Sequence, residues 1–94
     1  MDGAIVDRDA LRATIKEVIV ESLRLDGVEP AGIEDDAPLF GEGLGLDSVD
    51  ALELVVALEK KFQIKIQSKD VGKDAFYSVA TLADLVASRL AAQA

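Results

Sequence analysis

The sequence has 94 residues and contains neither cysteine nor histidine. Without cysteine it can form no disulfide and no thiolate metal site, which fits a reducing, cytoplasmic location. Without histidine it also lacks the most common general base and the most common zinc ligand. Few of the side chains that commonly act as catalytic groups or metal ligands remain. We therefore expect no catalytic residue, no metal site and no enzymatic activity.

A long apolar run and an excess of basic residues are missing as well. No stretch approaches the length of a membrane-spanning helix, and the N-terminus lacks the basic and apolar regions of a signal peptide. Asp and Glu number 18 against 10 Lys and Arg, for a net charge of −8, and this sign disfavours binding to nucleic acids and anionic membranes. We expect a soluble, unprocessed chain without membrane insertion, whose protein partners carry basic surfaces.

Apolar residues that recur at helical spacing predict the secondary structure. The three main helices are expected over residues 7–25, 48–62 and 79–91. A short, irregular helix, weakened by Gly72, is expected over residues 68–75. Residues 63–66 alternate like a strand, but because no second strand pattern exists to pair with them, we expect an extended loop. The sequence therefore predicts one domain over residues 1–94, an all-α, up-and-down helical bundle of three main helices plus a short one.

A long loop precedes the second main helix, because glycine and proline interrupt most of residues 26–47. Its apolar side chains are too many for a disordered linker, and we expect them to hold the loop against the helices. They are Val28, Ile33, Leu39, Phe40, Leu44 and Leu46.

The same loop carries seven acidic residues and no basic one, and therefore almost all of the net charge. They are Asp26, Glu29, Glu34, Asp35, Asp36, Glu42 and Asp47. The acidic run 34–36 lacks the spacing of a calcium loop, and the glycines at 41, 43 and 45 are followed by no Gly-Lys-Ser/Thr. We therefore expect a solvated acidic run and a shaped turn, without a cation or nucleotide site.

The loop ends at Ser48, which opens the second main helix. Asp47 is a typical N-cap residue, and Asp50 follows three positions later, as in a capping box. The helix dipole and the free backbone N–H groups of the first turn then lie beside the Ser48 hydroxyl, an arrangement that favours phosphate. Asp-Ser before an apolar helix is often simple capping, but the glycine turn, the acidic charge and the short helical length favour Ser48 as the attachment point of a cofactor.

The apolar side chains of the second main helix form two stripes. The stripe predicted to face the core consists of Ala51, Leu54, Val55, Leu58 and Phe62. The other stripe, on nearly the opposite side, consists of Val49, Leu52 and Val56. Because a small one-layer domain buries one side of a helix, we expect this second stripe to be an exposed docking face. The alternative is that Val49 and Val56 pack against the glycine loop and the short helix as part of the core.

Asp47-Ser48 followed by Val-Asp-Ala-Leu-Glu-Leu resembles the D-S-L-x-x-x-E-L element of acyl carrier proteins. The resemblance extends from about residue 7 to residue 91 and is strongest over residues 38–62. It implies that Ser48 bears 4′-phosphopantetheine, transferred from coenzyme A by a phosphopantetheinyl transferase, and that this arm holds acyl groups as thioesters. It also implies a carrier of fatty or polyketide acyl chains that synthases, reductases and acyltransferases visit.

In that family the helix after the serine is the recognition helix. The acidic positions that the resemblance assigns to contact with basic patches of partner enzymes are Asp47, Asp50, Glu53 and Glu59, with Asp47 also serving the transferase. Lys60 and Lys61 stand where housekeeping members usually have acids, which indicates a specialised carrier. Two alternatives remain open: an aminoacyl or peptidyl carrier, and a small helical interaction module whose Ser48 is never modified. A monomer is expected.

Overall fold

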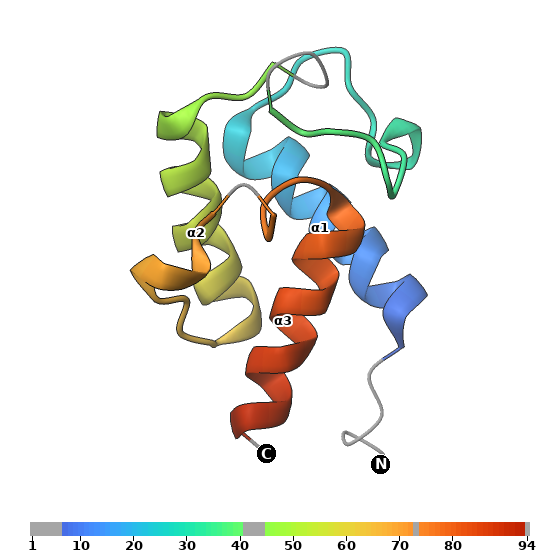
Figure 1. Ribbon diagram of the computed structural model, residues 1–94. Coiled ribbons are helices and arrows are strands. Elements are labelled where there is room, and N and C mark those ends of the chain that lie inside the picture. Colours follow the sequence, from blue (N-terminus) through green and yellow to red (C-terminus); the bar gives the residue numbers. More distant parts are fainter. Residues whose placement is uncertain (1–6, 41–44, 73, 94) are drawn as a thin grey trace.

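The computed structural model describes residues 7–40, 45–72 and 74–93, and it consists of three α-helices and two short 3-10 helices (Figure 1). In chain order these are α1 (Arg8–Leu23), η1 (Pro30–Gly32), α2 (Ser48–Phe62), η2 (Ser68–Asp70) and α3 (Val79–Gln93). In the part of the chain that the structure describes, the one extended pairing is an isolated bridge between Phe40 and Leu46. The predicted all-α fold with three main helices is confirmed.

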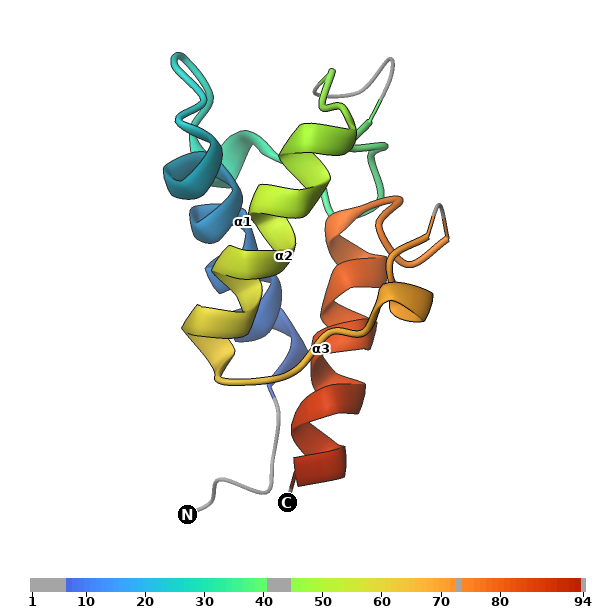
Figure 2. The ribbon, with the colours of Figure 1, turned by 90° about the vertical axis from the view of Figure 1, so that its left-hand side faces the viewer.

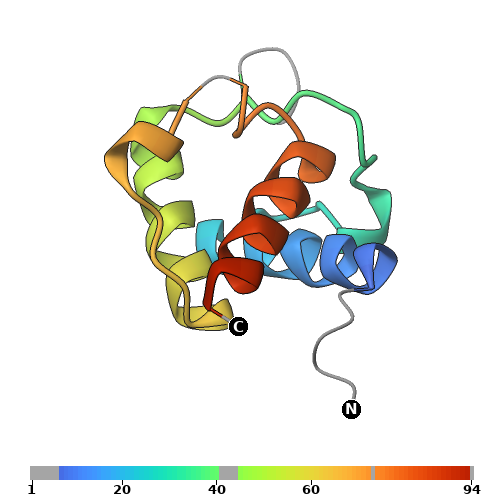
Figure 3. The same cartoon turned by 60° about the horizontal axis from the view of Figure 1, so that its bottom comes forward.

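The helices run in the order up, down and down. α1 rises in Figure 1 and α2 descends beside it, after which residues 63–78 return the chain to the top, so that α3 also descends (Figures 1 and 2). α1 packs against both other helices, whereas α2 and α3 touch each other over a shorter stretch. Figure 3 shows α1 lying across the other two. Because α2 and α3 are parallel, the connection between them has to span the length of the bundle.

One cluster of apolar side chains from all three helices and both connections forms the core. Its fully buried aliphatic members are Ile15, Ile19, Leu39, Leu54, Leu58, Val79, Leu82 and Val86. Burial of one such side chain stabilises a fold by about 1.5 to 3 kcal/mol. The predicted core stripe of α2 is confirmed at Leu54 and Leu58, while Ala51, Val55 and Phe62 are half-buried.

α1 and α2 end in the same way. Arg24 and Gln63, the residues after their last turns, are left-handed, with φ of 52° and 55°, and the N–H groups of Leu25 and Ile64 donate to carbonyls five residues earlier. Leu25 and Ile64 then turn back onto the core, the apolar contact that commonly accompanies such a helix end. The first helix therefore stops before the predicted residue 25, and Gly27, at φ 77°, serves the next turn.

The stretch after α2 confirms one prediction and corrects another. Residues 63–66 form a loop without helix or strand, as expected, and Ile64 and Ile66 are buried, so the strand-like alternation places two side chains in the core. The predicted short helix over residues 68–75 is reduced to η2. The Asp70 carboxylate holds η2 in place. It accepts from the Gln67 N–H at 3.0 Å and pairs with Arg89 of α3 at 2.7 Å. A continuous helix would not need these contacts.

The loop between α1 and α2 is held by its own apolar residues, as predicted. Ile33, Leu39 and Leu46 are buried, and Val28 and Phe40 pack partly against the core; Leu44 lies outside the described residues.

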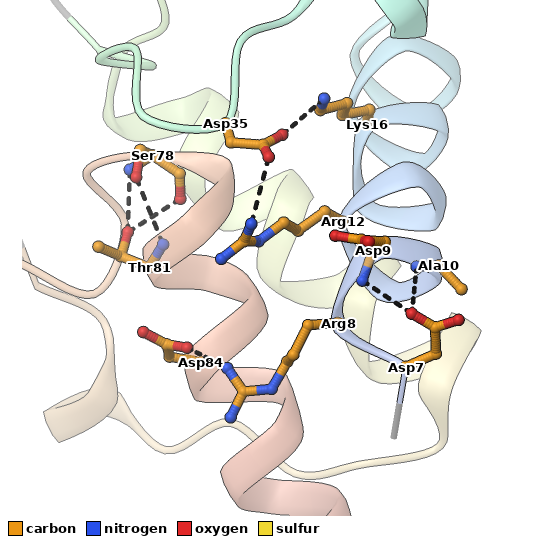
Figure 4. A network of polar contacts seen from close by, with 10 residues as sticks. All are labelled: Asp7, Arg8, Asp9, Ala10, Arg12, Lys16, Asp35, Ser78, Thr81 and Asp84. Carbon is orange, nitrogen blue, oxygen red and sulfur yellow. Dashed lines mark hydrogen bonds and ion pairs between the residues drawn. The ribbon is translucent and has the colours of Figure 1, made fainter. Parts of the chain in front are cut away.

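A polar contact adds to this attachment. The Asp35 carboxylate lies 2.6 Å from Lys16 Nζ and 3.3 Å from Arg12 Nη1 (Figure 4). The Asp35 carbonyl accepts from the Ala80 N–H. The prediction of a solvated acidic run is therefore wrong at its central residue, which ties the loop to α1 and α3. The hydrogen bond from Lys16 is the main cause that lowers the pKa of Asp35 below its ordinary value of 3.8, with help from Arg12 and against the effect of desolvation.

Three further sets of polar contacts involve α1 and α3 (Figure 4). Asp7 caps α1 by accepting from the N–H groups of Asp9 and Ala10. Ser78, predicted to cap the last helix, does so: its hydroxyl accepts from the Thr81 N–H at 3.3 Å, and the Thr81 hydroxyl accepts from the Ser78 N–H at 2.9 Å. Arg8 pairs with Asp84 across the two helices.

Candidate functional site

Ser48 is the first residue of α2, and its side chain is exposed. The preceding Asp47 has an extended backbone, and its Oδ1 accepts from the N–H groups of Val49 and Asp50 at 3.0 and 3.1 Å. Asp50 Oδ2 in turn accepts from the Asp47 N–H at 3.0 Å. This is the predicted capping box, with aspartate at both positions. It fixes the backbone on both sides of Ser48, so the hydroxyl leaves the helix in a defined direction.

The capping box also corrects the expectation that free backbone N–H groups lie beside the Ser48 hydroxyl. The N–H groups of Val49 and Asp50 are occupied by Asp47 and are therefore not free to hold a phosphate. What α2 offers to an anion on the Ser48 hydroxyl is the positive end of its dipole. Two nearby carboxylates oppose that attraction, so the site presents a reactive hydroxyl rather than a strong anion-binding pocket.

The turn before Ser48 is anchored in the core. Gly45 has a φ of 75°, a left-handed conformation that glycine adopts without strain. Leu39 and Leu46 are buried on either side of the turn and are joined by a hydrogen bond from the Leu46 N–H to the Leu39 carbonyl, at 3.3 Å. The Leu39 N–H donates to the Tyr77 carbonyl at 2.8 Å. The predicted role of Gly41 and Gly43 in this turn falls outside the described residues.

A hollow of about 440 Å³ adjoins Ser48. Its lining is apolar apart from the hydroxyls of Ser48 and Tyr77, and consists of Pro38, Phe40, Ser48, Ala51, Val71, Gly72, Phe76 and Tyr77. Tyr77, interpreted from the sequence as a packing residue, is 50% exposed at this hollow. The sequence did not identify these lining residues, because they come from three separate segments and share no periodicity.

The stripe of Val49, Leu52 and Val56 lies on the surface. These side chains are 64%, 66% and 48% exposed. The alternative that Val49 and Val56 belong to the core is therefore wrong. A helix that exposes three neighbouring apolar side chains has an uncovered face.

The acidic residues predicted for partner contact differ in their surroundings. Glu53 is exposed beside the stripe, and Asp50 takes part in the capping box. Glu59 is half-buried, and its Oε2 accepts from the Ile66 N–H at 2.9 Å. Glu59 therefore has a structural role that the sequence did not reveal, since its partner is seven residues away and outside the helix.

The described residues contain no group of three or more acidic, histidine or cysteine side chains that could hold a metal ion. No helix among them is long and apolar enough to cross a membrane.

Comparison with known proteins decides between the remaining interpretations. A family model described as a phosphopantetheine attachment site matches residues 13–88. The chain belongs to the acyl carrier protein family. Its function is that of a phosphopantetheine-bearing acyl carrier, which holds intermediates and catalyses no step itself.

Three relatives named acyl carrier protein illustrate the membership. The chain is 43% identical over 72 residues to the one from Wolinella succinogenes, covering 77% of this chain and 83% of that one. It is 42% identical over 77 residues to the one from a Sulfurovum species, covering 82% and 91%. With the one from Bdellovibrio bacteriovorus it is 39% identical over 64 residues, covering 68% and 77%.

The residues present fit phosphopantetheine. Attachment needs an accessible hydroxyl, and Ser48 provides one at an ordered helix start next to an apolar hollow. Ser78, by contrast, is only 2% exposed, and the Ser22 hydroxyl donates to the Val18 carbonyl within α1.

Proposed function

We propose that Ser48 is the residue to which a phosphopantetheinyl transferase attaches 4′-phosphopantetheine from coenzyme A. The observation that carries this proposal is the exposed Ser48 hydroxyl at the capped start of α2, at the edge of an apolar hollow. Ser48 Oγ attacks the phosphorus next to the pantetheine of coenzyme A and forms a phosphodiester. The pyrophosphate bond of coenzyme A breaks, adenosine 3′,5′-bisphosphate leaves, and the hydroxyl proton passes to a base of the transferase. The terminal thiol of the bound arm supplies the thioester chemistry.

Asp47 has two roles in this proposal. It orients Ser48 through the capping box, and its exposed carboxylate is a contact for the transferase. These roles are separable, because a serine at position 47 can cap a helix but carries no charge.

The partner face consists of the stripe Val49, Leu52 and Val56 with the carboxylates of Asp50 and Glu53. Exposed apolar side chains rimmed by acids suit enzymes with basic patches around an apolar contact. Such partners are the synthases, reductases and acyltransferases of acyl-chain synthesis. Glu59 contributes its charge to this face, but its carboxylate is already engaged by Ile66.

The cargo is an acyl chain of fatty or polyketide type. The apolar lining of the hollow beside Ser48 supports this choice over an aminoacyl or peptidyl cargo, because polar groups placed in such a hollow would lose hydrogen bonds to water. Fatty acid or polyketide biosynthesis, a cytoplasmic location and a monomeric state stay predictions.

Mass spectrometry of the intact protein tests the attachment site. Incubation with coenzyme A and a transferase of broad specificity is expected to add one phosphopantetheine group to the wild type and to Ser88→Ala, a control on the exposed side of α3. Ser48→Ala is expected to gain nothing and to retain its helical circular dichroism. Modification of Ser48→Ala would exclude Ser48 as the attachment point, and an unmodified wild type would favour the interaction module.

A further inference from the structure

The end of α2 and the extended stretch after it carry four exposed lysines in a chain of net charge −8. They are Lys60, Lys61, Lys65 and Lys69. The two acids of residues 59–70 make internal contacts: Glu59 accepts from the Ile66 N–H, and Asp70, whose side chain is 12% exposed, pairs with Arg89. This end of the molecule is therefore locally positive, whereas the loop before Ser48 carries almost all of the negative charge.

Two adjoining hollows surround Lys60. One, of about 490 Å³, lies on the exposed side of α2 and is lined by Leu52, Glu53, Val56, Ala57 and Lys60. The other, of about 390 Å³, lies where α1 meets α2 and is lined by Val18, Glu21, Ser22, Ala57, Lys60 and Lys61. They share Ala57 and Lys60 and therefore adjoin at these two residues. We call the two hollows together the lysine groove.

Stabilisation of α2 alone does not account for this arrangement. Lysines in the last turn of a helix interact favourably with its dipole, which explains Lys60 and Lys61. It does not explain Lys65 and Lys69, which lie beyond the end of α2, or the exposed Leu52 and Val56, which line one of the two hollows. Exposed apolar side chains bordered by charged ones suit an interface with an apolar centre and a polar rim.

We propose that the lysine groove binds an acidic, amphipathic segment of a partner protein. The apolar side of that segment covers Leu52 and Val56, and its carboxylates face Lys60 and Lys61. This inference extends the proposed function by naming the chemistry of a partner, and it rests on that function only for the statement that the partner is one that visits the carrier.

The distribution of charge favours a narrow segment over an extended anionic surface. Glu21 lines one hollow and Glu53 the other, and the acidic loop lies at the other end of α2, so a membrane or a nucleic acid would be repelled over most of its contact area. A single segment that covers Lys60 and Lys61 meets fewer of these acids.

The same geometry sets the register of a partner that spans the whole of α2. Ser48 and Lys60 are about 18 Å apart along the helix axis, at about 1.5 Å per residue. Such a partner needs basic residues near Ser48 and acidic residues about 18 Å farther along. A partner docked in the reverse direction would place like charges opposite each other at both ends, and such a difference separates correct from incorrect docking.

The test uses two synthetic amphipathic helical peptides with leucine on one side and either glutamate or lysine on the other. They are titrated into the isotope-labelled full chain at low ionic strength, and binding is followed by NMR. We expect the glutamate peptide to shift the amide signals of Lys60 and Lys61 and the methyl signals of Leu52 and Val56. Lys60→Glu is expected to weaken its binding by about tenfold or more. Arg24→Glu, the same charge change at an exposed residue at the end of α1, is expected to weaken it by less than about twofold.

Reversing the charge of the lysines should transfer binding to the peptide of opposite charge. The variant Lys60→Glu with Lys61→Glu is expected to bind the lysine peptide at the groove more tightly than the wild type does. Equal weakening by Lys60→Glu and Arg24→Glu would overturn the proposal, as would signal shifts confined to residues 26–40.

The remaining outcomes identify other occupants and would also overturn the proposal. Binding to phosphatidylglycerol vesicles that exceeds binding to the glutamate peptide would make the ligand a lipid surface. Self-association in sedimentation equilibrium that Lys60→Glu abolishes would make it a second copy of the chain. Loading of Ser48 is measured separately by mass, so a wild type that binds the peptide but accepts no phosphopantetheine would refute the proposed attachment and leave the groove intact.

Discussion

The two sides of α2 carry similar apolar side chains but have opposite environments. Leu54 and Leu58 are fully buried, whereas Leu52, only two positions from Leu54, is 66% exposed. Hydrophobicity alone does not separate them, because both stripes recur at helical spacing. The charged neighbours distinguish the two stripes, because Glu53 and Lys60 border the exposed one. Helix α1 covers the buried stripe. In this protein one side of a short helix holds the fold together and the other is exposed to solvent.

Truncation of one leucine on each side is the strongest test of this comparison. Leu58→Ala is expected to lower the free energy of unfolding by about 2 to 5 kcal/mol, because a cavity remains in the core. Leu52→Ala is expected to change it by no more than about 0.5 kcal/mol, because the side chain is already in water. Urea denaturation of both variants measures the difference. Similar losses would mean that the two sides are not distinct.

A charge placed in the exposed stripe tests the other half of the comparison. Val56→Asp is expected to weaken binding to a synthase or to the transferase by about 1 to 3 kcal/mol, the range for a central interface residue. Its thermal melt is expected to stay close to that of the wild type, since Val56 is about half exposed. Ala13→Asp, which adds an acid to the exposed side of α1, serves as the control in calorimetric titrations. If Val56→Asp unfolds the protein, the stripe belongs to the core after all.

At the start of α2, capping and recognition can be separated. Asp47→Ala is expected to reduce stability by about 0.5 to 2 kcal/mol through loss of the cap. Asp47→Ser is expected to restore most of that stability but not the rate of modification of Ser48, if the carboxylate is itself a contact for the transferase. Thermal melts and the time course of mass gain are the two measurements. If Asp47→Ser fully restores both the stability and the rate of modification, then Asp47 acts only as a helix cap.

Local and periodic features of this protein could be predicted from its sequence. The capping box at Asp47 and Asp50 involves residues three positions apart, and the stripes of α2 follow from helical geometry. The motif at Ser48 indicated the family from a few adjacent residues, and the family match over residues 13–88 confirms it. Each of these features lies within one or two helical turns.

Contacts between distant segments could not be predicted in this way. The Asp35 carboxylate was interpreted as solvated, yet its partners Arg12 and Lys16 lie about twenty residues earlier. The hollow beside Ser48 combines the loop, α2 and the stretch before α3. The short helix predicted over residues 68–75 is present only as η2, over residues 68–70. Asp70 of η2 pairs with Arg89 of α3, and local propensity carries no information about that contact.

The smallest expected effect is the change with pH in the contribution of Asp35 to the free energy of unfolding. Because Lys16 and Arg12 lower the pKa of Asp35 below its ordinary value of 3.8, the unfolded chain binds a proton here at higher pH than the folded chain does. The contribution of Asp35 to stability is therefore complete above about pH 5 and is lost as the pH falls through the lowered pKa. Its carboxylate is partly exposed, so we expect no more than about 1 kcal/mol at neutral pH.

Urea denaturation of Asp35→Asn and the wild type, at several values of pH, is the measurement. The difference in unfolding free energy is expected to be constant between about pH 5 and 8, and to be lost only as the pH falls through the lowered pKa of Asp35. Asp36→Asn serves as the control, because it removes the same charge from the exposed neighbour of Asp35, which takes part in none of the ion pairs among the described residues. A difference that persists in acid would mean that Asp35 acts through its shape and not its charge. The loop before Ser48 would then be held to α1 by packing alone.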